Sequence, residues 1–466
     1  MARRAALLFC CFAFLANAAT GCARREEKAG ASTTTNATTS SDEKAIVVEP
    51  YGPPTPAAPT QPLRVLVGGD LIPHRPSLVA PNAITNALAP LGPLFGKADI
   101  AIANYEAATG EVDKKAFRLA YAAPPSWLED LPRAGIGAVT VANNHACDLD
   151  YDGVDATLAA AARSGTIAIG GDPKGDPWQA RAIVERSGKR VCAVAWTTLI
   201  NAQHGCARTV KLAVAKLDKD GRAKVATALS RARASCDATI AIVHGGQEYV
   251  PQTNAMMQEM KHVAELGADA IVVHHPHIAS PVTVHATKDG RKVPIFASVG
   301  NLVSNQGESW KLPMFPVLRE NRRLVCVNGW TRLGVLADLA FSFTDEGKRL
   351  DWGYHLLWTE NEHANDKSIA VPKIEARLLD PEKDADIVSR LSDDEVGPVD
   401  LFDDACWIEK PVYTAEDARP DERCTAFTPL GQAPVAQSTH PPAPRANGED
   451  KPTARASTRE KGRSKR

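Results

Sequence analysis

The sequence lacks the features that would place it in several large classes of protein. Its 466 residues carry a net charge of −1, so the chain as a whole offers no electrostatic attraction to nucleic acid. It contains no Cys-x-x-Cys pair, which argues against a cysteine-based zinc site. Beyond the N-terminal segment it has no apolar run long enough to span a bilayer. Its 44% apolar and 23% charged residues are typical of a globular protein with a sizeable core.

The N-terminus has the pattern of an export signal. Arg3 and Arg4 precede an apolar run from Ala5 to Leu15, and small residues follow as far as Cys22. The ending Ala-Thr-Gly-Cys resembles a bacterial lipobox, which implies that Cys22 is acylated and becomes the first mature residue. We therefore expect an exported protein that one lipidated terminus tethers to a membrane of the cell envelope. Ordinary signal cleavage beside an incidental cysteine is the alternative.

Both ends of the chain have compositions that disfavour a packed core. Residues 23–62 are rich in Thr, Ser, Ala, Pro and charge, so we expect a disordered linker after the signal peptide of residues 1–22. Residues 431–466 hold eight Lys/Arg against three Asp/Glu and predict a disordered basic tail, either solvated or in contact with anionic envelope polymers. One domain of residues 63–360 remains, with residues 361–430 as a C-terminal extension packing on it.

The cysteines fit an exported chain but do not define their own pairing. Three of the ten lie in the N-terminal segment, and the remaining seven are odd in number. At least one of the seven is therefore free or paired elsewhere. Cys406 and Cys424 are a plausible local clasp, although the sequence does not establish connectivity.

Short apolar runs alternate with amphipathic stretches through the middle of the chain. Runs such as Thr239 to Val243 read as strands, and the stretches Tyr151 to Ala162 and Thr253 to Leu266 predict helices. The alternation indicates βα units, a mostly parallel sheet and hence the α/β class. Three closely spaced apolar runs then predict an antiparallel, strand-rich extension of the same domain, at residues 324–327, 333–343 and 352–358.

Polar residues follow the last residue of seven predicted strands, at the edge that carries the ligand crevice in α/β folds. Each one alone could be a helix cap, a turn residue or a hydrogen-bonded core histidine. Together they supply the hard oxygen donors and imidazoles that a divalent metal ion needs. The candidates are Asp70, Glu106, Asn144, His145, His244, His275 and His277.

The segment from His274 to His277 reads His-His-Pro-His and is the densest of these elements. On an extended segment, alternate side chains face the same side. We therefore expect His275 and His277 to point together into the site and His274 to point away. The sequence as a whole predicts that the strand ends converge on a single metal-binding site.

These motifs resemble, in order, those of the CapA family of bacterial capsule-synthesis proteins. That family is associated with poly-γ-glutamate and is related in fold to calcineurin-like metallophosphatases. The resemblance runs from about residue 63 to residue 306 and continues to about residue 357. It implies a metallophosphatase-like layered α/β fold, with mostly parallel strands at the site and an antiparallel strand-rich C-terminal extension. The motifs are Gly69-Asp70, Asn104-Tyr105-Glu106, Ala142-Asn143-Asn144-His145 with Asp148, His244-Gly245-Gly246-Gln247-Glu248-Tyr249, His274-His275-Pro276-His277 and Ser298-Val299-Gly300-Asn301.

The resemblance also implies a role for each site residue. Asp70 would hold the first metal ion, and Glu106 would take the bridging carboxylate position. The Asn144-His145 pair would carry catalysis, with Asn144 as an amide-oxygen ligand and His145 as general acid or transition-state stabiliser. The remaining ligands would be His244, His275 and His277, and the substrate-side residues would be Arg75, Glu248 and Asn301. One or two divalent ions are implied, with Mn, Fe and Zn all open.

Two of the substrate-side assignments have alternatives. Glu248 is expected either to orient His244 or to contact substrate. Arg75 lies five residues after Asp70 and either binds an anionic group or is an ordinary surface arginine.

The sequence departs from the superfamily pattern at three positions. The superfamily usually carries Asp-x-His at the first strand, but Ile72 stands at the histidine position and His74 comes two residues too late. Glu106 stands where the superfamily prefers Asp, and Gly245 stands where tryptophan often follows the histidine. The missing imidazole leaves two arrangements open: one tightly held ion with a weaker partner, or a full binuclear pair.

The expected function is capsule or poly-γ-glutamate-type polymer synthesis or processing by an envelope-anchored protein with a metal-dependent hydrolase site. Its substrate would be a phosphoester or a γ-linked glutamyl chain. The alternative is a non-catalytic component that uses the same metal site to bind anionic polymer and assist its export. Both interpretations give the protein the same partners: an anionic envelope polymer, a membrane reached through the lipid anchor, and capsule-synthesis membrane proteins. Neither involves nucleic acid.

Overall fold

Two β-sheets form the centre of the structure. The computed structural model describes residues 61–73, 78–111, 121–201, 206, 209–312, 317–361, 373–395, 397–409 and 422–429. The predicted signal peptide, the basic tail and the linker up to residue 60, together with Cys22 and Arg75, lie outside these residues. None of the helices in the described ranges is both long enough and apolar enough to cross a membrane.

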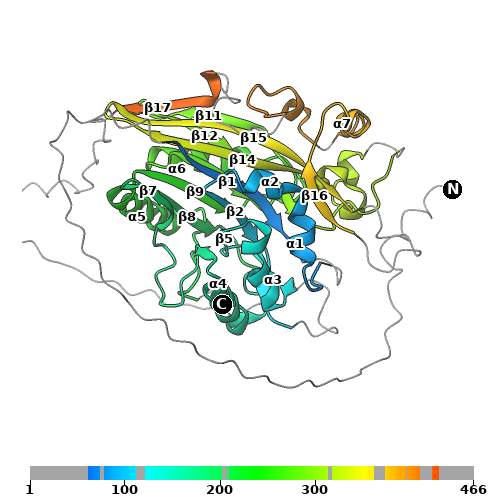
Figure 1. The fold of residues 1–466 in the computed structure, drawn as a ribbon, viewed down its shortest axis with the longest axis horizontal. Helices are drawn as coiled ribbons and strands as arrows, with labels where there is room; N and C mark the ends of the chain where they lie inside the picture. The colour runs from blue at the N-terminus through cyan, green and yellow to red at the C-terminus, as the bar shows by residue number, and fades with distance from the viewer. Residues whose placement is uncertain are drawn as a thin grey trace, which may run out of the picture. The chain divides into compact units, whose positions relative to one another are not determined.

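The larger sheet has nine strands and combines parallel and antiparallel pairing (Figure 1). The neighbouring strands β1, β2, β5 and β6 are parallel to one another, and β13 adds to β1 in the same direction. The other strands, β14 to β17, pair antiparallel. In sheet order the strands are β16 (Glu375–Leu378), β15 (Gly347–Glu360), β14 (Leu333–Phe343), β1 (Leu63–Leu71), β2 (Ile100–Tyr105), β5 (Ala138–Thr140) and β6 (Ile167–Ile169), with β13 (Asn301–Val303) beside β1 and β17 (Thr425–Pro429) beside β15.

The smaller sheet has six strands, of which the central four are parallel. Its two edge strands, β11 and β7, pair antiparallel with their neighbours. In sheet order the strands are β11 (Val282–Ala286), β12 (Lys292–Phe296), β10 (Ala270–His274), β9 (Ala238–His244), β8 (Lys189–Thr197) and β7 (Arg181–Arg186). A separate parallel pair is formed by β3 (Ala108–Thr109) and β4 (Ala122–Ala123).

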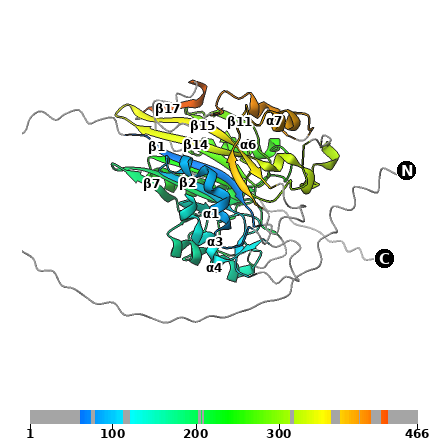
Figure 2. The ribbon, with the colours of Figure 1, turned by 45° about the vertical axis from the view of Figure 1, so that its right-hand side comes forward.

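The two sheets share a core, because side chains of a strand alternate between its two faces. Val65 of β1 and Ile242 of β9 belong to one apolar cluster between the sheets. Their neighbours Leu66 and Val243 face two other clusters, each closed by helices. The described part of the chain therefore has four layers, helix–sheet–sheet–helix (Figures 1 and 2).

Six helices supply the outer layers. The larger sheet is covered by α1 (Ala83–Leu88), α2 (Gly92–Phe95), α3 (Pro125–Asp130) and α4 (Asp150–Ser164). The smaller sheet is covered by α5 (Lys219–Ser235) and α6 (Asn254–Glu265). A further helix, α7 (Ala385–Ser392), follows β16.

The structure confirms the predicted α/β class and the strand-rich C-terminal part, with two differences. The parallel strands divide between two sheets, because hydrophobic periodicity identifies strands without assigning them to a sheet. The strand predicted at residues 324–327 is wrong, since Val325–Val327 form a 3₁₀ turn. Residues 324–327 are only half-buried, and a run of four apolar residues does not distinguish a strand from a turn that packs one side on the core.

Three disulfides link the described cysteines. Cys406 pairs with Cys424, which confirms the predicted clasp. The other two bonds join Cys147 to Cys206 and Cys192 to Cys236, with Cys326 outside all three.

Described parts of residues 361–430 join the larger sheet, because both β16 and β17 pair with β15.

Candidate metal centre

The predicted ligands come together where the carboxyl ends of strands from both sheets meet. Asp70 is the penultimate residue of β1, Glu106 follows β2 and the Asn144-His145 pair follows β5. From the smaller sheet, His244 ends β9, and the remaining two histidines follow β10. All seven side chains are buried: Asp70, Glu106, Asn144, His145, His244, His275 and His277.

Glu106 is the common member of two candidate ligand groups. Its carboxylate, Asp70 and His244 offer ligand atoms within 4.8 Å of one another. The same holds for Glu106, His275 and His277. A carboxylate shared by two groups suits the bridging position that the sequence resemblance implies.

The carboxylate of Glu106 is fully buried, and neither of its oxygens has a hydrogen-bond partner among the described residues. His277 Nε2 and His244 Nε2 lie 3.8 and 3.9 Å from Oε1, too far for hydrogen bonds. Burial, and then the charges of Asp70 and Glu248, hold the pKa of Glu106 well above its usual range. A buried, unpaired carboxylate is costly, and a divalent cation is the group that its surroundings of carboxylate, amide and imidazole donors fit.

Asp70 and His277 form an ion pair at the centre. His277 Nδ1 lies 3.1 Å from Asp70 Oδ2. Burial alone would raise the pKa of Asp70, but the hydrogen bond from His277 and the nearby histidine charges lower it. Burial would likewise lower the pKa of His277, and Asp70 raises it above the usual value. Asn301 Oδ1 also lies 3.1 Å from His277 Nδ1, so this buried amide contacts a candidate ligand at the same nitrogen that pairs with Asp70.

The segment from His274 to His277 forms a turn, here called the histidine turn. It brings His275 and His277 together, as predicted, but not through an extended segment. Both residues have positive φ, at 101° and 58°, and their ring centroids are 6.0 Å apart. His274 points away and its Nε2 lies 2.9 Å from the carbonyl oxygen of Gly68. The strand-alternation argument is therefore wrong, because the chain leaves β10 in a turn directly after His274. Burial and His277 lower the pKa of His275 to about 3, which keeps its imidazole neutral near pH 7.

His244 and Asn144 link the two sheets. His244 Nε2 lies 2.8 Å from Asn144 Oδ1. Burial, and then His275, hold the pKa of His244 well below its usual value, so this imidazole is also neutral near pH 7. Metal coordination requires the neutral form of histidine.

Asn104 contacts two candidate ligands, Asp70 and His244, a role that was not predicted from the sequence. Its Nδ2 donates to Asp70 Oδ1 at 2.8 Å and lies 3.2 Å from His244 Nδ1. Its Oδ1 accepts a hydrogen bond from Thr140 at 2.9 Å. The signal was available, since Asn104 is the penultimate residue of β2 and belongs to the Asn104-Tyr105-Glu106 motif.

His145 and Asp148 form a buried dyad beside these ligands. His145 Nδ1 lies 2.6 Å from Asp148 Oδ2, and the ring stacks on Tyr121 with centroids 3.9 Å apart. Nδ1–H donates to the carboxylate, which leaves Nε2 as the nitrogen that can exchange a proton. Nothing in the described ranges hydrogen-bonds to this Nε2. Tyr121 was also missed, since its contact with His145 bridges 24 residues of sequence.

Other predicted site residues lie outside the described residues or make no hydrogen bond with the candidate ligands that would define their role. Arg75 and His74 lie outside the described residues. Glu248 is half-buried and makes no hydrogen bond to His244, whose ring nitrogens face Asn104 and Asn144 instead. Its orienting role is therefore not supported, and its contact with substrate stays a prediction. Ile72 is fully buried and supplies no ligand at the position where the superfamily has histidine.

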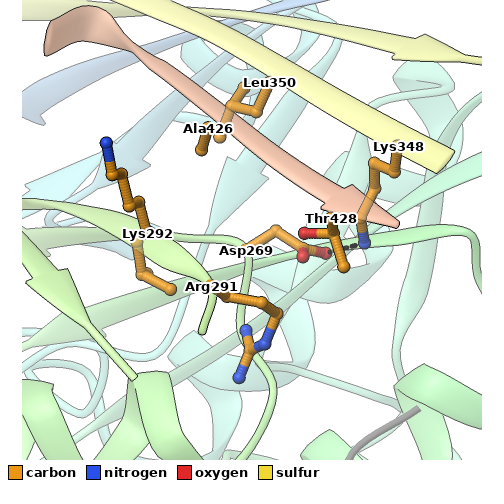
Figure 3. A pocket seen from close by; sticks show the side chains of 8 residues that line it. Asp269, Arg291, Lys292, Lys348, Leu350, Ala426 and Thr428 are labelled. Carbon is orange, nitrogen blue, oxygen red and sulfur yellow. Dashed lines mark hydrogen bonds and ion pairs between the residues drawn. The ribbon is translucent and has the colours of Figure 1, made fainter. Parts of the chain in front are cut away.

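A small hollow elsewhere in the molecule does not belong to this site. It lies at the amino end of β10, where Asp269 precedes the strand, and Lys348 pairs with that carboxylate at 2.7 Å (Figure 3). Arg291 donates to the carbonyl oxygens of Ala264 and Ala268 near the end of α6. These cations are already used in structural contacts.

Comparisons with known proteins match the same part of the chain. The family model for the bacterial capsule synthesis protein PGA_cap matches residues 64–306, which include every candidate ligand. The chain is 27% identical over 168 residues to the PGA biosynthesis protein CapA of Bacillus subtilis (strain 168), covering 36% of this chain and 42% of that protein. It is 25% identical over 224 residues to the capsule biosynthesis protein CapA of Bacillus anthracis, covering 47% and 53%. The matches thus span about half the length of these relatives.

Proposed function

The chain belongs to the bacterial capsule synthesis protein family PGA_cap, and from this we propose that its metal centre is a hydrolase site that acts on a capsule polymer of poly-γ-glutamate type or on a phosphoester. Family membership supports the capsule-related role. The observation that carries the proposed chemistry is Glu106, a buried carboxylate with no hydrogen-bond partner in the described chain, surrounded by imidazole and carboxylate donors.

The donor set fits one or two divalent cations. Oxygen and imidazole donors suit Mn, Fe or Zn, and the absence of cysteine from the set argues against a thiolate site. A cation there supplies Lewis-acid chemistry, polarising a carbonyl or phosphoryl oxygen and making water more acidic. The residues that would hold it are Asp70, Glu106, Asn144, His244, His275 and His277.

His145 is the residue proposed to move a proton. Asp148 accepts the Nδ1 proton and fixes the ring, with the stacked Tyr121 covering one face. Nε2 can then deliver a proton to the leaving group as a general acid. A site that only served structure would gain nothing from such a dyad beside a ligand.

Both proposed substrates are anionic, which suits a cationic centre. A γ-linked glutamyl chain carries a carboxylate on each residue, and a phosphoester carries its own charge.

The test uses the purified full chain and two histidine variants. Bound metal is measured, and hydrolysis of phosphoesters and of poly-γ-glutamate is assayed for the parent, His145→Ala and His285→Ala. His285 is the matched control, because it lies on the edge strand β11 and pairs there with Glu265 of α6. We expect stoichiometric metal in all three proteins and hydrolysis in the parent and His285→Ala alone.

Two other results would change the interpretation. If the parent binds metal and turns over neither substrate, the alternative of a non-catalytic binder of anionic polymer is favoured. Failure to bind Mn, Fe or Zn under metal-replete conditions would remove the premise that both interpretations share.

We also propose that the protein is exported and anchored to a cell-envelope membrane through Cys22, where it would meet capsule-synthesis membrane proteins. The N-terminal pattern of residues 1–22 motivates this proposal. Cells expressing the parent or Cys22→Ala are labelled with a fatty-acid analogue and fractionated. We expect label and membrane association in the parent only, and equal labelling of both proteins would contradict the proposal.

A further inference from the structure

The segment that follows β8 reaches ligand-bearing turns from both sheets. The backbone N–H of Thr198 donates to the carbonyl oxygen of His244 at 2.9 Å. The backbone N–H of Asn201 donates to the carbonyl oxygen of Asn144 at 3.1 Å. His244 belongs to the smaller sheet and Asn144 follows a strand of the larger one. Residues 197–201 thus connect the two halves of the metal centre.

The side chain of Asn201 contacts the amide of Asn144. Asn144 Nδ2 lies 3.4 Å from Asn201 Oδ1, while Asn144 Oδ1 faces His244 Nε2 at 2.8 Å. An amide binds a cation through oxygen and not through nitrogen, so its orientation decides whether it is a ligand. The Oδ1 atom of Asn201 can only accept a hydrogen bond. It therefore favours the orientation in which Nδ2 of Asn144 faces Asn201 and Oδ1 of Asn144 faces His244.

Asn201 also contacts His145, but without a hydrogen bond. Asn201 Nδ2 lies 3.4 Å from His145 Nδ1, which is already within 2.6 Å of Asp148. Because Nδ1–H donates to Asp148, the Asn201 amide packs against this nitrogen without hydrogen-bonding to it. The effect of Asn201 on the centre is therefore exerted through Asn144.

A disulfide fastens this arrangement. Cys147 lies between His145 and Asp148, and its partner Cys206 lies five residues after Asn201. Both cysteines are fully buried. The covalent bond keeps the turn that carries the Asn144-His145 pair close to the segment that contacts it, and such support from outside the ligand set holds a site in its productive geometry.

We propose that Asn201 is a positioning residue, which selects the amide orientation of Asn144 that turns Oδ1 into the metal centre, and that the Cys147–Cys206 disulfide keeps it there. The inference rests on the metal centre of the proposed function and is independent of whether hydrolysis occurs.

The first experiment titrates the chelator-treated full chain with Co²⁺ and records the visible absorption of the bound ion. Asn201→Ala is expected to bind Co²⁺ about tenfold more weakly than the parent, with a shifted absorption band, because loss of such a supporting residue costs 10–100-fold in affinity. Asn201→Asp keeps an acceptor oxygen and is expected to retain the parental band. The control is Asn321→Ala, in a 3₁₀ turn outside the centre, which should match the parent.

The second experiment separates the disulfide from general stability. The double variant Cys147→Ser/Cys206→Ser is compared with Cys192→Ser/Cys236→Ser, whose bond joins β8 to the end of α5. Both should unfold more easily than the parent, but only the first should bind Co²⁺ about tenfold more weakly. Amide hydrogen exchange in residues 141–149 should also accelerate in the first variant alone.

The outcomes separate this inference from the proposed function. Parental affinity and an unshifted band in folded Asn201→Ala would overturn the inference, as would an equal loss in Asn321→Ala. If Asn201→Ala does not fold, Asn201→Asp and the two disulfide variants decide: a shifted band in Asn201→Asp, or equal affinities in the disulfide variants, overturns it. If the parent hydrolyses nothing while Asn201→Ala still weakens Co²⁺ binding, the hydrolase proposal fails and the inference stands.

Discussion

At the scale of single residues, we expect Glu106 to have opposite effects on the stability of the metal-free protein and on its affinity for metal. Its carboxyl group is buried and has no hydrogen-bond partner in the described chain, so without a cation it opposes folding. We expect Glu106→Gln to raise the free energy of unfolding in the presence of chelator by about 1–3 kcal/mol, the cost of an unsatisfied buried group. We expect the same variant to lose most of the stabilisation that Mn²⁺ gives the parent. Chemical denaturation with and without Mn²⁺ measures both effects.

Glu259→Gln provides the matched control. Glu259 is also buried, but Arg222 donates to it at 2.9 Å. Its substitution should lower stability by about 1 kcal/mol and leave the response to Mn²⁺ unchanged. If Glu106→Gln has a lower free energy of unfolding than the parent in the presence of chelator, the carboxylate has a stabilising partner in the fold.

A second residue-scale prediction concerns Asp338, which joins β14 to β1 and β15. Arg64 Nε donates to its Oδ1 at 2.8 Å, and His355 Nε2 lies 3.2 Å from Oδ2. Burial alone would raise the pKa of Asp338, but the hydrogen bonds from Arg64 and His355 lower it. Asp338→Asn should therefore cost on the order of 3 kcal/mol near pH 7, as expected when one member of a buried pair is removed.

The pH dependence of this difference follows from the lowered pKa. The stabilisation from Asp338 is fully present above the unfolded-state pKa of about 3.9, and it is lost as pH falls through the lower folded-state pKa. Unfolding of the parent and Asp338→Asn should thus differ by a constant amount from pH 5 to 7 and converge below about pH 4. Asp155→Asn, at an exposed pair with Lys211, should change stability by less than about 1 kcal/mol throughout.

The sequence was sufficient to predict most candidate ligands but not the residues that support them. Asp70, Glu106 and the histidines follow recognisable strands, so their chemistry and position could both be predicted. Asn104 and Asn201 have ordinary amide side chains, and their importance arises only from contacts made across the fold. No local pattern distinguishes such an amide from a surface residue.

At the scale of elements, the place of Asp70 depends on a close approach of two backbones. A Cβ on Gly69 would lie 2.1 Å from the carbonyl oxygen of Gly300, which accepts the backbone N–H of Asp70 at 3.1 Å. Gly69→Ala should therefore separate β1 from β13 and lower stability by at least about 3 kcal/mol. Gly68→Ala is the control, because the nearest atoms to its Cβ would belong to flexible side chains, Leu302 at 3.1 Å and Leu336 at 3.4 Å. The control should cost about 1 kcal/mol, and equal losses by thermal unfolding would contradict this account.

The elements themselves show where periodicity succeeds and where it fails. The bounds predicted for β14 coincide with the structure, because a long run buried among neighbouring strands has a strong pattern. The four-residue run at residues 324–327 was predicted to be a strand, but Val325–Val327 form a 3₁₀ turn. The histidine turn shows a related limit, since the positive φ values of His275 and His277 are unusual for non-glycine residues.

At the scale of the whole molecule, the candidate centre lies where two sheets meet. Asp70, Glu106 and Asn144 come from the larger sheet, and His244 with the histidine turn comes from the smaller one. The sequence predicted convergence on one site but described one mostly parallel sheet. Alternation of strands and helices carries no information on which strands share hydrogen bonds, so that pattern alone does not predict the second sheet.

Ligands from both sheets mean that a bound cation links the two halves of the fold at this edge. A ligand that binds only the folded state stabilises it by about 2.7 kcal/mol when its free concentration is 100 times its dissociation constant. We therefore expect chelation to lower the melting temperature and to accelerate amide exchange at the carboxyl ends of β2, β5, β9 and β10 together. The amino end of β10, beside the ion pair of Asp269 with Lys348, should exchange as before, because that ion pair does not depend on the centre. Faster exchange confined to one sheet would show that the cation is held by that sheet alone, and the proposed link between the sheets would then be wrong.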